Sequence, residues 1–331
     1  MTEPTLDIVA IGNAIVDVIA QADDAFIAAQ GIAKGSMRLV DPETAGRLYD
    51  GMGPGREISG GSAANTLAGI AALGARCAFV GQVADDQLGQ VFTHDIRAHG
   101  VRFDTPARPG GPPTGRCLVL VSPDGQRTMN TSLGAAHHLP AGSVEGGLIE
   151  SAAYLYLEGY MWDPPEPRRA ILRAIELARA AGRKVALTLS VTFFIEPYRD
   201  DFLKLIDDGL IDILFCNEEE AACLLQMEDG SAAAEALARR LPLLVVTRGE
   251  EGACAFEGGR RYDVAAEPVA RVVDTTGAGD LFAAGFMAGQ IAGRSVADSL
   301  VMGAVAAAEV ISHYGARPEA DLRALVAARL G

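Results

Sequence analysis

Apolar and polar positions alternate in regular blocks along the second half of the chain. Almost wholly apolar runs of strand length recur at residues 153–157, 184–189 and 211–216, and segments with a helical repeat separate them at residues 167–181 and 198–208. Uninterrupted apolar runs are typical of strands buried on both faces, and their alternation with helices indicates parallel strands joined by right-handed crossovers. The pattern predicts an α/β fold with a mainly parallel central sheet flanked by helices. Further apolar runs at residues 6–11 and 77–82 extend that sheet.

Two stretches break the regular pattern. Residues 21–58 are more polar and contain one strand-like run, at residues 34–41. A connector rich in proline and glycine leads into two more strand-like runs, at residues 116–121 and 127–132, in the arrangement of a hairpin. We therefore expect a single domain over residues 1–331, in which segments from about 14–58 and 104–137 form a small β-sheet that closes over a ligand as a lid.

Composition and charge narrow the classes of function. The 331 residues are 49% hydrophobic and 21% charged, as in a globular protein, and the formal charge of −15 makes nucleic acid an unexpected partner. The five cysteines are odd in number and lack C-x-x-C spacing, which fits thiols in a reducing cytoplasm. The N-terminal apolar run lacks a basic cluster before it and is interrupted by Asp17. We expect no leader peptide, no membrane span and a cytoplasmic location.

The most informative chemistry lies in residues 273–280, Val-Asp-Thr-Thr-Gly-Ala-Gly-Asp, which lead into an apolar helix. The small residues leave backbone N–H groups exposed at the positive end of the helix dipole, which makes an anion site. A carboxylate at such a site repels the anion, so the presence of Asp280 there indicates a function other than anion binding. If the anion is a phosphoryl group, Asp280 can accept the proton of an attacking hydroxyl, while Asp274 braces the turn through amides or a nearby cation. The stretch predicts a small-molecule kinase.

Two more polar groups follow predicted strands, where ligands of parallel sheets bind. Asn217 and Glu220 lie about one helical turn apart and can organise water around Mg²⁺ on a polyphosphate, although acidic residues are common in first turns for dipole reasons alone. Residues 247–252, Thr-Arg-Gly-Glu-Glu-Gly, offer a hydroxyl, a guanidinium and free amides to phosphate oxygens, or form a hairpin turn.

Candidate contacts to the phosphoryl acceptor are scattered. Asp17 is a single carboxylate in an apolar strand-like run, so it grips ligand hydroxyls or occupies an exposed edge. Gly60 and Gly61 precede a helix and allow close backbone approach and a hinge, or form an ordinary strand-to-helix turn. Residues 160–162, Tyr-Met-Trp, follow a strand and offer a stacking surface to a nucleobase, or belong to the core.

In this order the motifs resemble those of the ribokinase-like (PfkB) family of sugar and nucleoside kinases, over essentially the whole chain. The first family signature is matched by residues 60–65, Gly-Gly-Ser-Ala-Ala-Asn, and the second, which is highly specific, by residues 274–280. An N-x-x-E element at residues 217–220 and a T-x-G-x-x-G element at residues 247–252 lie between them. The resemblance implies a ribokinase-like three-layer fold and an ATP-dependent phosphotransferase.

The resemblance also implies a role for each motif. Asp280 would be the general base, and the amides of Gly277, Ala278 and Gly279 would form an anion hole for the γ-phosphoryl group. The acceptor would be held by Asn13, Asp17, Asn65 and Tyr160, with Gly60 and Gly61 flexing as the lid closes. ATP would contact Asn217, Thr247, Gly249, Gly252 and Thr275, and Glu220 would position Mg²⁺. The family often uses a monovalent cation such as K⁺ near the second signature, which the sequence leaves open.

The identity of the acceptor rests on finer detail. Residues 12–17, 187–193 and 273–280 look more like adenosine kinases than like ribokinase or fructokinases, so we expect the primary hydroxyl of a ribonucleoside, with a role in purine salvage. Residues 127–132 and the pair at 137–138 depart from that pattern and leave room for guanosine, inosine or a sugar such as ribose, fructose or ketodeoxygluconate. A metabolite sensor without chemistry is the remaining alternative, and the oligomeric state is open between monomer and homodimer.

Overall fold

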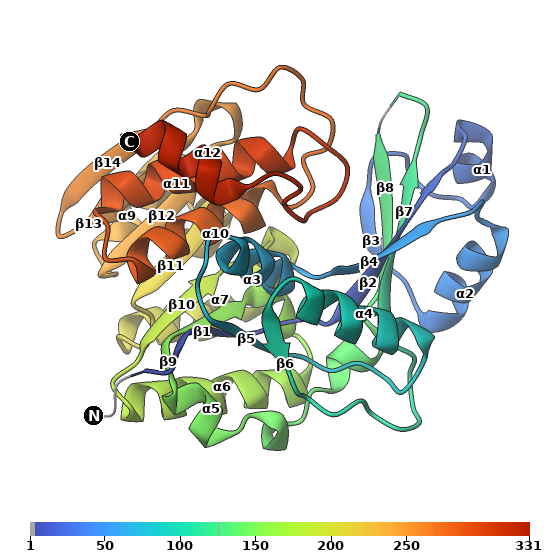
Figure 1. The fold of residues 1–331 in the computed structure, drawn as a ribbon, viewed down its shortest axis with the longest axis horizontal. Coiled ribbons are helices and arrows are strands. Elements are labelled where there is room, and N and C mark those ends of the chain that lie inside the picture. Colours follow the sequence, from blue (N-terminus) through green and yellow to red (C-terminus); the bar gives the residue numbers. More distant parts are fainter. Residues whose placement is uncertain (1–3, 125) are drawn as a thin grey trace.

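Two β-sheets form the framework of the protein in the computed structural model, which describes residues 4–124 and 126–331 (Figure 1). The large sheet has nine strands in the order β14-β13-β12-β11-β10-β9-β1-β5-β6, parallel except at the β12–β13 and β13–β14 pairs. Its strands are β1 (Leu6–Ile11), β5 (Cys77–Val80), β6 (Val101–Phe103), β9 (Ala152–Glu158), β10 (Lys184–Thr188), β11 (Ile213–Asn217), β12 (Leu243–Thr247), β13 (Ala253–Glu257) and β14 (Arg260–Val264). The predicted α/β fold with a mainly parallel sheet is confirmed.

Helices cover both faces of the large sheet, because its apolar strands present side chains to both sides. Within β1, Ile8 and Ala10 join one buried cluster, whereas Val9 and Ile11 join the other. The first cluster contains side chains of α3 (Ser62–Ala72), α4 (Gln87–Ala98), α10 (Ala278–Ile291) and α11 (Val296–Val310). The second contains side chains of α5 (Gly146–Glu150), α6 (Pro165–Ala180), α7 (Thr192–Asp207), α8 (Glu218–Leu225) and α9 (Gly230–Ala238). The chain ends in α12 (Leu322–Leu330), and short 3-10 helices lie at Gly134–His138, Ala141–Ser143, Gly159–Met161 and Gly249–Glu251.

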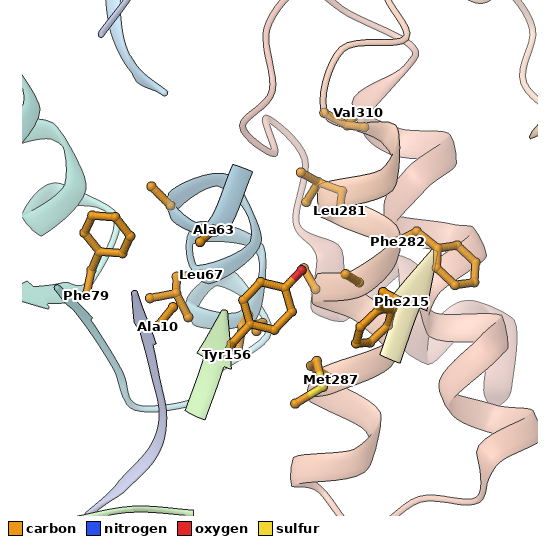
Figure 2. Packing of buried hydrophobic residues seen from close by; sticks show 14 of the residues in the cluster. Ala10, Ala63, Leu67, Phe79, Tyr156, Phe215, Leu281, Phe282, Met287 and Val310 are labelled. Carbon is orange, nitrogen blue, oxygen red and sulfur yellow. The ribbon is translucent and has the colours of Figure 1, made fainter. Parts of the chain in front are cut away.

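The contact between α3 and α10 positions the site. A Cβ atom on Gly69 of α3 would lie 2.6 Å from Cβ of Ala284 on α10, so the two helices approach more closely than a larger residue would allow. Below them, the ring of Tyr156 lies between Leu67 of α3 and Leu281 of α10 (Figure 2). Hydrogen bonds from Ser62 and Asn65 to Asp280 join the first turns of these two helices, which lie more than 200 residues apart in sequence.

The small sheet has five strands in the order β3-β8-β7-β2-β4, which confirms the second sheet. They are β2 (Ile15–Gln21), β3 (Met37–Leu39), β4 (Arg56–Gly60), β7 (Gly115–Val121) and β8 (Arg127–Ser132). The helices α1 (Asp24–Ala29) and α2 (Pro42–Gly51) lie on the side of this sheet that faces away from the large one (Figure 1). The hydrophobic pattern did not predict β4, because Ile58 is its one large apolar residue and its partner β2 supplies the pairing.

The described residues add two general facts. All five cysteines are free thiols, and four of them are buried. Within residues 4–124 and 126–331, no helix combines the length and the apolar character needed to cross a membrane.

Candidate active site

A cavity of about 560 Å³ lies where the two sheets meet. The large sheet lines it with residues at the carboxyl ends of its strands, and the small sheet lines it with side chains from one face. Most of the predicted site residues share this lining: Asn13, Asp17, Gly61, Asn65, Tyr160, Asn217, Glu220, Thr247, Thr275, Gly277, Ala278, Gly279 and Asp280. The other three are Gly60, beside Gly61, and Gly249 and Gly252, which line an adjoining cavity.

Asp280 lies in the first turn of α10 and is held by two donors from α3. Oγ of Ser62 donates to one carboxylate oxygen at 2.7 Å, and Nδ2 of Asn65 donates to the other at 2.9 Å. Burial raises the pKa of Asp280, and the two hydrogen bonds and Arg317 partly oppose that rise. A carboxylate with a raised pKa and a fixed orientation toward a cavity suits a general base.

The turn before α10 presents backbone amides to the same cavity. Gly277 is the N-cap residue with φ of 79°, and no side chain caps the helix. Within the described residues, the amides of Gly277 and Gly279 have no acceptor, whereas the amide of Ala278 donates to the carbonyl of Thr275 at 3.2 Å. In this conformation two of the three predicted anion-hole amides are therefore free to bind an anion.

Asp274 stabilises this turn through hydrogen bonds and an ion pair. Its carboxylate accepts from the amide of Thr276 at 3.0 Å and from the amide of Gly315 at 2.9 Å, and it forms a buried ion pair with Arg127. Arg127 belongs to β8 of the small sheet and also donates to Oγ1 of Thr276 at 3.1 Å. Sequence reasoning missed Arg127, because a basic residue in a hairpin strand carries no signal that it contacts the turn before α10.

Glu158 is a second residue that the sequence reasoning missed. It ends β9, is fully buried, and accepts from the backbone and side-chain nitrogens of Asn13 at 2.7 and 2.8 Å and from the amide of Ala63 at 2.7 Å. Burial raises its pKa to about 7 against the effect of these hydrogen bonds. Glu158 thus ties the loop after β1 to the start of α3. An acidic residue that ends an apolar strand was the available signal.

Asp17 and two asparagines offer acceptor groups to a ligand. Burial raises the pKa of Asp17 to about 7, and Arg317 and Arg127 oppose the rise. A Cβ atom on Gly60 would lie 2.6 Å from its carboxylate, so the glycine makes room for it. Oδ1 of Asn13 and Oδ1 of Asn65 are buried without a hydrogen-bond partner among the described residues. Buried polar atoms of this kind usually have a partner, which a bound hydroxyl would supply.

Tyr160 lines the cavity, but Met161 and Trp162 do not. The Tyr160 ring packs edge-to-face on Phe194 with centroids 5.7 Å apart, beside Ser190, whose φ of 76° is unusual for a residue other than glycine. Met161 and Trp162 lie in the core, where Nε1 of Trp162 donates to Asp201 at 2.9 Å. Of the two alternatives that the sequence left open, a nucleobase surface or the core, Met161 and Trp162 fit the core, because both are buried between the large sheet and its helices.

A second cavity of about 570 Å³ adjoins the first. The two share the lining residues Thr247, Thr275, Ala278 and Gly279. The remaining wall of the second cavity is mainly apolar and includes Pro268, Val269, Ala304 and Ile311, together with Gly249 and Gly252. Thr247 does end a strand that turns back as a hairpin, since β12 and β13 pair antiparallel. An extended ligand can therefore occupy both cavities and cross the anion-hole turn.

Asn217 and Glu220 form a capping box at the start of α8. The amide of Glu220 donates to Oδ1 of Asn217 at 2.7 Å, and the Glu220 carboxylate accepts from the Asn217 amide at 3.1 Å and from Nδ2 at 3.2 Å. Burial raises the pKa of Glu220 to about 7. Glu220 lines the main cavity, and each of its carboxylate oxygens accepts one hydrogen bond within this box, so each can also accept from a metal-bound water.

Comparison with known proteins identifies the class of this site. Residues 51–322 match the family model described as pfkB family carbohydrate kinase. The fold superposes with TM-score 0.92 on a solved structure described as a probable sugar kinase from Rhizobium etli CFN 42, at 45% identity over 99% of this chain and 98% of that one. It superposes with TM-score 0.91 on adenosine kinase from Sinorhizobium meliloti, at 48% identity over 98% and 99%.

Among curated sequences, adenosine kinase of Saccharomyces cerevisiae is 27% identical over 94% of this chain and 96% of its own length. The fold is that of ribokinase-like kinase structures, with a mainly parallel sheet between helices and a second small sheet. The chain therefore belongs to the pfkB family of carbohydrate kinases, and it is a kinase.

Proposed function

We propose that the protein transfers the γ-phosphoryl group of ATP to the primary hydroxyl of a ribonucleoside, with adenosine as the first candidate. The observation that carries this proposal is the composition of the main cavity. Near Asp280 it is lined by polar groups that suit a ribose, Asp17, Asn13 and Asn65, and beyond them by apolar side chains of the small sheet, including Met37, Leu39, Met129 and Leu133. An apolar compartment beside a hydroxyl-binding one suits a nucleobase attached to a sugar better than a sugar alone.

The reaction needs one proton transfer and one displacement. Asp280 accepts the proton of the acceptor hydroxyl, whose oxygen forms a bond to the γ-phosphorus while the bond from that phosphorus to the β,γ-bridging oxygen breaks and ADP leaves. Ser62 and Asn65 keep the carboxylate oriented. The amides of Gly277 and Gly279 face the charge that develops on the transferred group, and the amide of Ala278 joins them if it leaves Thr275.

ATP fits the pair of adjoining cavities. Its base and ribose occupy the mainly apolar second cavity near Gly249 and Gly252, and its phosphates pass Thr247 and Thr275 toward the anion-hole turn. Asn217 lines the main cavity on the same side. This arrangement directs the γ-phosphate at the hydroxyl that Asp280 activates.

The residues around Glu220 fit the expected Mg²⁺, whereas those around Asp274 do not fit the expected monovalent cation. Bound Mg²⁺ neutralises phosphate charge, and Glu220 would hold it through a water molecule, as its remaining lone pairs permit. The surroundings of Asp274 do not fit a monovalent cation, because two amides and the guanidinium of Arg127 already occupy its carboxylate.

A sugar kinase is the second candidate function. Glu158 and Asn13 place a polar, hydrogen-bonded floor under the cavity that suits a free sugar as well as a ribose, and the similar Rhizobium etli protein is described as a probable sugar kinase. A guanosine or inosine acceptor would use the same apolar compartment as adenosine.

An acceptor panel tests the proposal. Purified protein with labelled ATP and Mg²⁺ is incubated with adenosine, guanosine, inosine, ribose, fructose and ketodeoxygluconate, and the phosphorylated products are separated. We expect adenosine to give the highest kcat/KM. Turnover of sugars without turnover of any nucleoside would exclude the nucleoside proposal and leave the sugar kinase.

A further inference from the structure

The segment that follows α11, residues 311–317, touches two parts of the site at once, and we call it the strap. The amide of Gly315 donates to Asp274 at 2.9 Å. The next residue, Ala316, packs on the anion-hole turn so closely that a Cβ atom on Gly277 would lie 2.6 Å from its own Cβ. The residue after that, Arg317, turns to the junction between the small sheet and α3. Three consecutive residues thus join the catalytic turn to this junction.

Arg317 brackets the glycine pair at the junction. Its guanidinium is buried and donates to the carbonyl of Ser59 at 3.0 and 3.1 Å, to Oγ of Ser59 at 2.8 Å, and to the carbonyl of Ala64. Ser59 is the residue before the end of β4, and Ala64 lies in the first turn of α3. Gly60 and Gly61 therefore lie between two residues whose carbonyls bind the same guanidinium. Ser59 is in turn bound through its amide and hydroxyl to Asp95 of α4, at 2.9 and 2.6 Å.

Acidic groups around Arg317 also favour its buried position. The titratable groups that face Arg317 are Asp17 of β2, Asp95 and His99 of α4, and Asp280 of α10. Burial lowers the pKa of Arg317 to about 10, so the guanidinium stays charged at neutral pH. Around Asp280, the further groups are the donors Ser62 and Asn65 and, within electrostatic range, Asp17, Glu158, Tyr156 and Tyr160. Arg317 is the cation that opposes the rise in the pKa of Asp280.

We propose that Arg317 is a positioning residue for phosphoryl transfer, which holds the Gly60-Gly61 junction in register with the turn that bears Asp280. The proposed acceptor-binding carboxylate Asp17 lies on the small sheet, whereas the proposed base lies on α10. Arg127 already links β8 to the turn before α10, and the strap adds a second link, at the end of β4 and the start of α3. The inference rests on the proposed role of Asp280 as the base. A lysine keeps the charge but lacks the planar fork that reaches both carbonyls.

Two pairs of variants test the proposal in the full-length protein. Arg317→Lys and Arg317→Met are compared with Arg323→Lys and Arg323→Met, because Arg323 is an exposed arginine that also donates to a carbonyl of α3, Ala72, but away from the site. Steady-state kinetics with ATP and the acceptor found in the panel are measured from pH 5 to 9, together with Tm. We expect both Arg317 variants to lose at least about tenfold in kcat with the KM for ATP within about twofold, and the Arg323 variants to stay within about twofold throughout.

The pH profile separates positioning from charge. Without the cation the carboxylate of Asp280 is harder to ionise, so Arg317→Met should move the acid limb of kcat/KM to higher pH by about half a unit or more, whereas Arg317→Lys should leave the limb in place. Wild-type kcat in folded Arg317→Lys overturns the proposal, and this variant decides alone if Arg317→Met does not fold. The proposal is also overturned if kcat falls in proportion to the loss of Tm, and by the same relation, in both the Arg317 and the Arg323 variants. Full activity of Asp280→Asn would instead refute the proposed function.

Discussion

The two sheets build one cavity in different ways. The large sheet contributes at the carboxyl ends of its strands, where Glu158, Asn217 and Thr247 are each the last residue of a strand. The first turn of α10, with its free amides, lies at the same cavity. The small sheet contributes with a face, where Asp17 stands among apolar side chains such as Met129 and Leu39. Residues at a strand end can take part in chemistry without disturbing the core, whereas residues on a sheet face must also pack. Under the proposed function, we expect the strand ends of the large sheet and α10 to determine the reaction, and the face of the small sheet to contribute to the choice of acceptor.

Replacing Asp280, the proposed base, should give the largest effect. It should affect only the large-sheet side of the cavity. Asp280→Asn keeps the shape of the side chain but cannot accept the hydroxyl proton, so we expect kcat to fall by about 10²–10⁴-fold. Binding of ATP, measured by calorimetry, should stay within about threefold. The control is Asp200→Asn, on an α7 side chain that is 94% exposed. A kcat within tenfold of wild type would exclude Asp280 as the base.

A substitution on the small sheet should instead weaken binding of the phosphoryl acceptor. Asp17→Asn removes a charged hydrogen-bond acceptor from the cavity, and we expect the KM for the acceptor to rise by about 10- to 100-fold, as for the loss of a hydrogen bond to a charged group. The KM for ATP should not change. Asp50→Asn, on the exposed side of α2, is the matched control. Equal increases in both KM values would mean that the two sides of the cavity are not separate in function.

The smallest expected effect concerns the junction between the sheets. Gly61 has φ of 96°, and a Cβ atom there would lie 2.2 Å from the carbonyl oxygen of Asn13, so Gly61→Ala combines backbone strain with a collision. Gly31 has φ of 64° with nothing near its Cβ position, so Gly31→Ala carries the strain alone, about 1–2 kcal/mol. Denaturant unfolding should show a larger loss in Gly61→Ala than in Gly31→Ala. Equal losses would show that the close approach at Gly61 is easily relieved.

The same contrast explains what the sequence could predict. Strands buried on both faces appear as continuous apolar runs, so the large sheet and the polar groups at its edge could be predicted, including Asn217 and Asp280. On the face of the small sheet only Asp17 was predicted, and the apolar side chains around it were not, because a period of two does not say which face meets the cavity. The contact of Arg127 with Asp274 joins the small sheet to the turn before α10, and the local sequence pattern carries no trace of it. For Trp162 the sequence left a nucleobase surface and the core as alternatives, since position after a strand does not reveal the direction of a side chain.

The long-range hydrogen bonds around Asp280 and the strap also determine when a growing chain can become active. Ser62 and Asn65 precede Asp280 by 218 and 215 positions, and Arg317 reaches back 258 positions to Ser59. Contacts over such separations form only after the intervening chain has emerged and folded. A chain that is still on the ribosome can complete its first strands and helices, yet it has no oriented base. We therefore expect a growing chain to lack kinase activity until α10 and the strap have been made and have folded against the earlier elements.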